Sequence, residues 1–113
     1  HNTDRIAPAY LRSMIRAADE RQAFQIESLN DSDVLKITQE YDDEIVNTYI
    51  YCYDGVLRES FISSELSFVP EDGEEVCDMD RMLIRFNSNT MNIRLLKGET
   101  ETEMNVLLYA SVN

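Results

Sequence analysis

The fold is decided near the middle of the chain by residues 45–62, which read IVNTYIYCYDGVLRESFI. Two runs rich in β-branched and aromatic residues flank Asp54 and Gly55, and this pair tolerates the positive φ angles of a type I′ turn. We therefore predict a β-hairpin in which Tyr53 pairs with Val56. Both faces of the hairpin are fairly apolar, so we expect it to lie at the centre of its sheet.

The predicted turn also fixes which side chains share a face, because successive residues of a strand point to opposite sides. One face is assigned to the core and the other carries the tyrosines. The core face holds Val46, Thr48, Ile50, Cys52, Leu57 and Phe61, and the opposite face holds Tyr49, Tyr51, Tyr53, Val56, Arg58 and Ile62.

A helix is predicted ahead of the hairpin, from about residue 6 to residue 23. Pro8 suits its first turn, and apolar residues recur at spacings of three and four, which predicts one buried stripe. Arginines on another face are expected to stay hydrated. The stripe consists of Ala7, Leu11, Met14, Ile15 and Ala18, and the bases are Arg5, Arg12 and Arg16.

Antiparallel strands are predicted over the rest of the chain, from about residue 24 to residue 110, with a loop over residues 70–80. The expected fold class is α+β: one domain over residues 1–113, with an N-terminal amphipathic helix packed on an antiparallel β-meander. Three alternating runs close the meander, at residues 82–86, 91–95 and 104–108.

The composition argues against several classes of function. The chain has 113 residues, enough for one domain, and its 22 acidic and 10 basic residues give a net charge of -12. Such a surface repels phosphate, which disfavours nucleic acid as a partner. The only histidine is His1, and there is no glycine-rich phosphate loop, so we predict no enzymatic activity, no catalytic residue and no cofactor.

Two groups of side chains are candidate binding sites. The acidic segment 71–80 could supply oxygen ligands to Ca²⁺, but its spacing is not that of the twelve-residue calcium loop, and we favour a solvated loop. Tyr49, Tyr51 and Tyr53, together with Arg58, could bind a sugar or a peptide, but we favour packing under the helix or across the sheet. The weak calcium candidates are Glu71, Asp72, Glu74 and Asp78.

Cys52 and Cys77 are the only cysteines in the chain. Their separation matches no zinc site, and either one disulfide or two free thiols is compatible with the sequence. We favour free thiols, because Cys52 is predicted on the core face, where a buried thiol is ordinary.

Two stretches resemble a known group of proteins. Residues 10–19 (YLRSMIRAAD) resemble the end of the N-terminal helix of type IV pilin-like proteins. Residues 48–59 (TYIYCYDGVLRE) resemble a hairpin of an uncharacterised bacterial family of small, membrane-anchored, pilin-like proteins. That family carries no known catalytic residues.

The resemblance implies a non-enzymatic structural or assembly subunit, similar to a minor pilin or pseudopilin, with an apolar membrane anchor upstream of residue 1. It also implies an extracytoplasmic location, and partners among other pilin-like subunits or an export machine. The alternative function is a secreted or surface binding module that uses the tyrosine face or the acidic segment 71–80.

Overall fold

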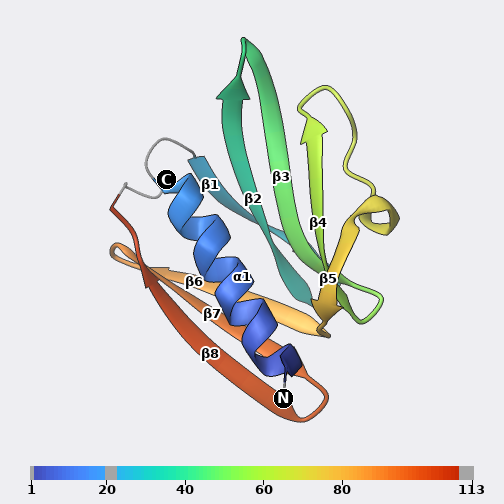
Figure 1. Ribbon diagram of the computed structural model, residues 1–113, viewed down its shortest axis with the longest axis vertical. Helices are drawn as coiled ribbons and strands as arrows, with labels where there is room; N and C mark the ends of the chain where they lie inside the picture. Colours follow the sequence, from blue (N-terminus) through green and yellow to red (C-terminus); the bar gives the residue numbers. More distant parts are fainter. Residues whose placement is uncertain (1, 20–22, 110–113) are drawn as a thin grey trace.

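The computed structural model describes residues 2–19 and 23–109, with side chains from residue 5 onward. Over these residues the chain forms one α-helix and eight strands in two antiparallel sheets (Figure 1). Sheet A has the strand order β1-β2-β3-β4-β5, and sheet B has the order β6-β7-β8. The elements are α1 (Asn2–Ala18), β1 (Ala23–Leu29), β2 (Ser32–Tyr41), β3 (Glu44–Tyr53), β4 (Val56–Ser63), the 3₁₀ turn η1 (Pro70–Asp72), β5 (Glu74–Asp78), β6 (Arg81–Asn87), β7 (Thr90–Lys97) and β8 (Thr100–Leu107).

The predicted α+β fold, a pilin-like helix packed on a single meander, is wrong. The protein is mostly β, and the chain leaves sheet A after β5 to begin a separate sheet with β6. The physical reason is that sheet A and the closing meander each carry an apolar face, and two such faces are buried by packing against each other. The short α1 adds its stripe to the core that the sheets share.

The helix is amphipathic in the way its spacing predicts. Ala7, Leu11, Ile15 and Ala18 are buried, Met14 is half-buried, and the three arginines are exposed. The predicted bounds are wrong: α1 already includes Asn2 and ends at Ala18, and Ala23 begins β1, while residues 20–22 lie outside the described part of the chain. Within that part, no helix is long and apolar enough to cross a membrane.

The helix also joins the two ends of the described chain. Arg12 Nη1 donates to the backbone oxygen of Asn105 in β8 at 3.2 Å, and the Tyr109 N–H donates to Asp19 Oδ2 at 2.7 Å. Figure 1 shows α1 beside β8 along much of its length. The first and last described elements therefore close the same core.

The central hairpin is confirmed. Tyr53 pairs with Val56, and the two turn residues have positive φ angles, 53° at Asp54 and 75° at Gly55. The hairpin lies within sheet A, since β3 is flanked by β2 and β4, and β4 is flanked by β3 and β5.

Replacing Gly55 with valine should lower the free energy of unfolding by about 1–2 kcal/mol, since an L-residue with a β-branched side chain is strained at positive φ. Denaturant unfolding followed by circular dichroism measures this change. Val56→Ala, at a half-buried position next to the turn, controls for general sensitivity of the hairpin. An unchanged midpoint for Gly55→Val would contradict the type I′ turn.

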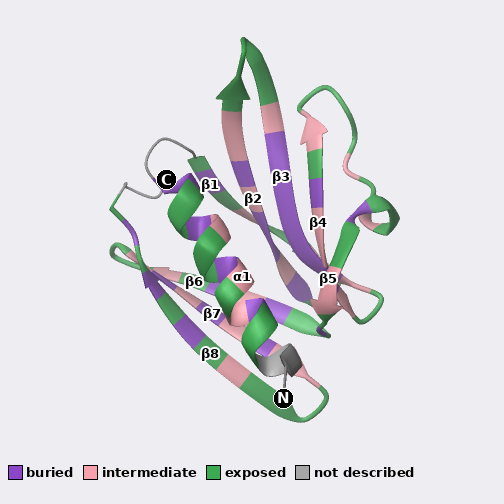
Figure 2. Cartoon of the chain, in the orientation of Figure 1, coloured by how far each residue is buried: buried purple, intermediate pink, exposed green. Residues whose placement is uncertain are grey.

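The core face of the hairpin is only partly confirmed. Ile50, Cys52 and Leu57 are buried as predicted, but Phe61 is 55% exposed. Sheet B and α1 cover the part of sheet A near the Asp54–Gly55 turn, and Figure 2 shows exposed residues toward the far ends of β2 and β3. Phe61 lies beyond the covered part, where its ring meets that of Tyr41 edge to face at 6.0 Å.

The closing three-stranded meander is confirmed as sheet B, and its edge strand β6 is fastened to sheet A by side chains. The Met82 N–H donates to Ser32 Oγ at 2.9 Å, and the Ile84 N–H donates to Asp33 Oδ2 at 2.8 Å. These bonds satisfy two amides of an edge strand that would otherwise be open to another chain.

Candidate functional site

The tyrosine face is largely covered. Tyr49, Tyr51 and Tyr53 share one face of β3 as predicted, but Tyr49 is 6% exposed and Tyr51 is fully buried. Phe68, from the segment after β4, stacks on the Tyr49 ring at 4.2 Å and meets the Tyr51 ring edge to face at 4.7 Å. An aromatic binding surface made of all three rings is therefore excluded by burial.

The third ring, that of Tyr53, is half-buried and is already in contact with neighbouring side chains. The Arg58 guanidinium lies 5.8 Å from the centre of the Tyr53 ring, and the Tyr53 hydroxyl donates to Glu71 Oε1 at 2.8 Å. The pKa of Glu71 is lowered by a hydrogen bond from its own backbone and then by that hydroxyl. Tyr53, Arg58 and Glu71 thus hold η1 against sheet A.

The predicted loop over residues 70–80 is wrong, because it contains η1 and the strand β5. The calcium candidates are consequently spread out: Glu71 and Asp72 lie in η1, while Glu74 and Asp78 lie at opposite ends of β5. Among the residues that the structure describes, no three His, Cys, Asp or Glu side chains come close enough together to hold a metal ion. The structure does not bring the four candidates into one site.

The two cysteines are free, which confirms the favoured prediction. Cys52 and Cys77 pair with Leu57 from opposite sides, so their Cα atoms are two strand spacings apart, roughly 10 Å. A disulfide needs Cα atoms within about 7 Å. Burial raises the pKa of the Cys52 thiol to about 12, and partial burial also raises the pKa of Cys77, so neither thiol is activated as a nucleophile.

The feature that stands out is the outer edge of β4. Strand β5 pairs with β4 only over Val56–Glu59, so within the described chain no strand covers the outer edge of Ser60–Ser63. The Ser64 N–H donates to the Ile45 oxygen at 2.9 Å, and the ladder alternates from there. The backbone groups of Phe61 and Ser63 therefore point away from β3.

Part of this edge is satisfied by a local turn. The Ser63 oxygen accepts the Leu66 N–H at 3.0 Å. The groups that remain directed outward are the N–H and C=O of Phe61 and the N–H of Ser63. We call Ser60–Ser63 the open edge of β4.

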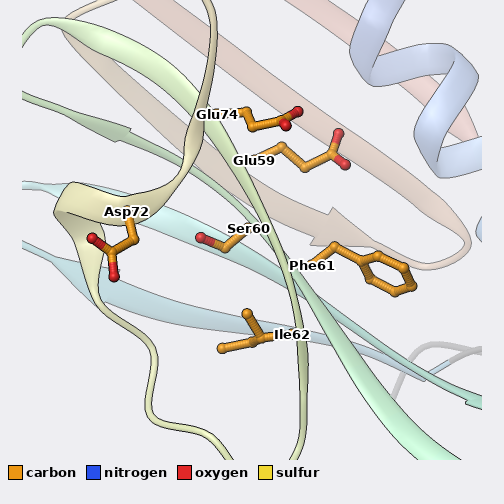
Figure 3. A pocket seen from close by; sticks show the side chains of 6 residues that line it. All are labelled: Glu59, Ser60, Phe61, Ile62, Asp72 and Glu74. Atoms are coloured by element: carbon orange, nitrogen blue, oxygen red, sulfur yellow. The ribbon is translucent and has the colours of Figure 1, made fainter.

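A groove of about 390 Å³ follows the open edge (Figure 3). In the figure, Glu59, Phe61 and Glu74 project to one side of β4, and Ser60, Ile62 and Asp72 lie on the other. These six residues line the groove, so it contains three carboxylates and no basic side chain. An exposed aromatic ring beside unpaired backbone is the combination that an extended peptide recognises.

The wall of the groove is fixed by hydrogen bonds from sheet A. The Tyr51 hydroxyl donates to the Pro70 oxygen at 2.8 Å, and Arg58 Nη1 donates to the oxygens of Glu71 and Gly73, both at 3.4 Å. These bonds hold η1 on the tyrosine face, so the chain turns aside before Glu74 instead of continuing β5 along β4. The opening beside the open edge is thus built by specific residues.

Glu59 also contacts the helix. The Tyr10 hydroxyl donates to Glu59 Oε1, and burial together with this bond raises the pKa of Tyr10. Glu74 lies directly opposite Glu59 across the β4–β5 pair, so two carboxylates face each other at one end of the groove. Like charges placed in this way destabilise a sheet unless a cation is nearby.

A family model described as a domain of unknown function, DUF4860, matches residues 2–97, from α1 through β7. The chain belongs to the DUF4860 family. No curated protein and no solved structure is significantly similar to it. The family description supplies no partner, location or site, so the resemblance to pilin-like proteins stays a prediction.

The sequence prediction missed the open edge of this DUF4860 domain. The register set by the Asp54–Gly55 turn predicts Phe61 on the core face, because Phe61 lies on the same side of the strand as Leu57. One signal was present in the sequence: Pro70 and Gly73 interrupt the segment after β4, which limits how far it can pair along that strand.

Proposed function

We propose that this domain is a protein-binding module and that its site is the groove along the open edge of β4. The observation that carries the proposal is the set of outward backbone groups, the N–H and C=O of Phe61 and the N–H of Ser63, beside an exposed phenylalanine ring. An open sheet edge is a template for another strand, and natural proteins cover such edges unless they use them. A catalytic role is not part of the proposal.

A comparison with the other outer strand edges of the two sheets supports the open edge of β4 as the binding site. The β6 edge has two amides bonded to Ser32 and Asp33, and β8 lies beside α1, where Arg12 Nη1 donates to the Asn105 oxygen. The outer edge of β1 is likewise paired with no described strand, but it carries no exposed aromatic ring, because Phe24 is buried and Ile26 is packed against the core. At the open edge of β4, by contrast, a large ring projects into solvent.

The proposal is tested by selecting binders from an unbiased library of short displayed peptides and measuring their affinity for two variants. Phe61→Pro removes the outward N–H, which an edge strand tolerates, and Phe61→Ala removes only the ring. We expect selected peptides to lose binding to Phe61→Pro and to bind Phe61→Ala more weakly than the parent.

Two further readouts keep this test decisive. Thermal unfolding shows whether Phe61→Pro is folded, and amide chemical shifts of the unmodified protein locate the peptide even if that variant is not. Shifts at Phe61 and Ser63 support the proposal. A library without binders, or binders that shift β1 instead, would refute it.

A further inference from the structure

We infer that the partner is an extended basic segment, with Lys or Arg alternating with aliphatic residues, which adds to the open edge as a strand antiparallel to β4. This inference rests on the proposed function and names the chemical class of its partner.

The charge of the groove selects a basic partner. Glu59, Asp72 and Glu74 line it, and the chain as a whole carries a net charge of -12. A second copy of the chain would bring the same carboxylates to the same place, so edge-to-edge self-association is opposed by like-charge repulsion. A cationic side chain would instead relieve the facing pair Glu59 and Glu74.

The alternation of side chains places the cations on one side of the added strand. Glu59, Phe61 and Glu74 share one side of the groove. A lysine there can lay its methylene stem along the exposed Phe61 ring and bring its ammonium group to the two carboxylates. The neighbouring residues of the partner fall on the side of Ser60, Ile62 and Asp72, where an aliphatic side chain packs against Ile62.

The backbone sets the register. Every strand pair in sheet A is antiparallel, so a strand that continues the line of β5 along β4 is antiparallel to β4. The partner residue opposite Phe61 then exchanges both of its backbone hydrogen bonds with Phe61, and its side chain lies on the same side as the ring. That residue is the basic one, so the amides of the basic residues face β4 and those of the aliphatic residues face solvent.

Two capped peptides test the charge, one alternating lysine with valine and one alternating glutamate with valine. Fluorescence anisotropy with the whole chain gives the dissociation constants. We expect the lysine peptide to bind at least tenfold more tightly, and its dissociation constant to rise with salt, since exposed charge pairs are screened. Equal affinities, or affinities that do not depend on salt, would overturn the basic class of partner.

Two N-methylated forms of the lysine peptide test the register. Methylation of the lysine amides should abolish binding, because those amides donate to β4, whereas methylation of the valine amides should leave the affinity within about twofold of the parent peptide. Loss of binding on valine methylation alone, or indifference to both, would overturn antiparallel addition.

A matched pair of protein variants locates the charge. Glu74→Gln should raise the dissociation constant by about twofold to fivefold, the usual size for an exposed ion pair, while Glu99→Gln in the β7–β8 turn should not change it. An equal response to the two would overturn the placement. Library peptides that fail to bind Phe61→Pro but are not basic would overturn the basic class of partner and leave the proposed function standing. If no peptide binds the open edge, both the inference and the proposed function are overturned.

Discussion

Replacing Leu11 with alanine should lower the free energy of unfolding by about 2–5 kcal/mol, which is the usual cost of removing a buried leucine side chain. Leu11 is 0% exposed and lies in the core that α1 shares with both sheets. The loss comes from apolar contacts and from the cavity that is left, since α1 is the only described helix and no neighbouring helix can fill the space.

Urea unfolding followed by circular dichroism measures this effect. Ile6→Ala is the matched control, because Ile6 lies on the same helix, has a side chain of similar size and is 44% exposed. We expect Ile6→Ala to change the free energy of unfolding by less than about 1 kcal/mol. Equal losses for the two variants would show that α1 is not packed in the core as described.

Replacing Gly73 with alanine should cost about 3 kcal/mol, at the upper end of the usual penalty for overpacking. The backbone at Gly73 is extended, with φ -69° and ψ 149°, so any residue can adopt it. The obstacle is space: an added Cβ would lie 2.9 Å from Tyr51 Cζ, nearer still to the Tyr51 hydroxyl, and 3.1 Å from Arg58 Cβ. Tyr51 is fully buried and has no room to yield.

The controls for this variant separate crowding from backbone strain. Gly98→Ala adds a Cβ with no atom within 4 Å but at a φ of 59°, so it should cost only about 1–2 kcal/mol, for strain alone. Combining Gly73→Ala with Tyr51→Phe removes the hydroxyl that is closest to the added Cβ and should recover part of the lost stability. A Gly73→Ala variant as stable as the parent would contradict the packing of η1 on the tyrosine face.

The hairpin and the helix could be predicted because their signals are local. Asp54 and Gly55 specify a turn by their own backbone preferences, and the turn then fixes the register of β3 on β4. The stripe through Leu11 and Ile15 indicates a buried helix face whatever covers it. Neither inference needs knowledge of distant parts of the chain.

The division into two sheets could not be predicted, because it depends on contacts between residues far apart in sequence. Nothing local at Met79 or Asp80 shows that β6 will not pair with β5. The separation is held by Ser32 and Asp33, which bond to amides of β6 some fifty residues later. Alternation predicts that a strand has an apolar face, but not which layer will cover that face.

The open edge escaped prediction for the same reason. Phe61 has the spacing of a core residue, and its exposure follows from how far sheet B and α1 extend over sheet A. The sequence of β5 gives no strand signal, because it lies in a run of carboxylates with no alternation of apolar residues. The strand forms because the edge of β4 is available for pairing and because Arg58 forms an ion pair with Glu75 at 3.9 Å. Tertiary contacts override low strand propensity there.

The joining of α1 to β8 has a consequence for synthesis on the ribosome. The helix is made before all the described strands, yet β8, whose Asn105 oxygen accepts a hydrogen bond from Arg12, is made after the other described strands. Until then sheet A can pair its own neighbouring strands and β6 can pack on it, but β7 and the stripe of α1 lack their contacts with β8. We expect the nascent chain to stay vulnerable to aggregation and to proteases until β8 emerges, and then to complete its core late and in one step.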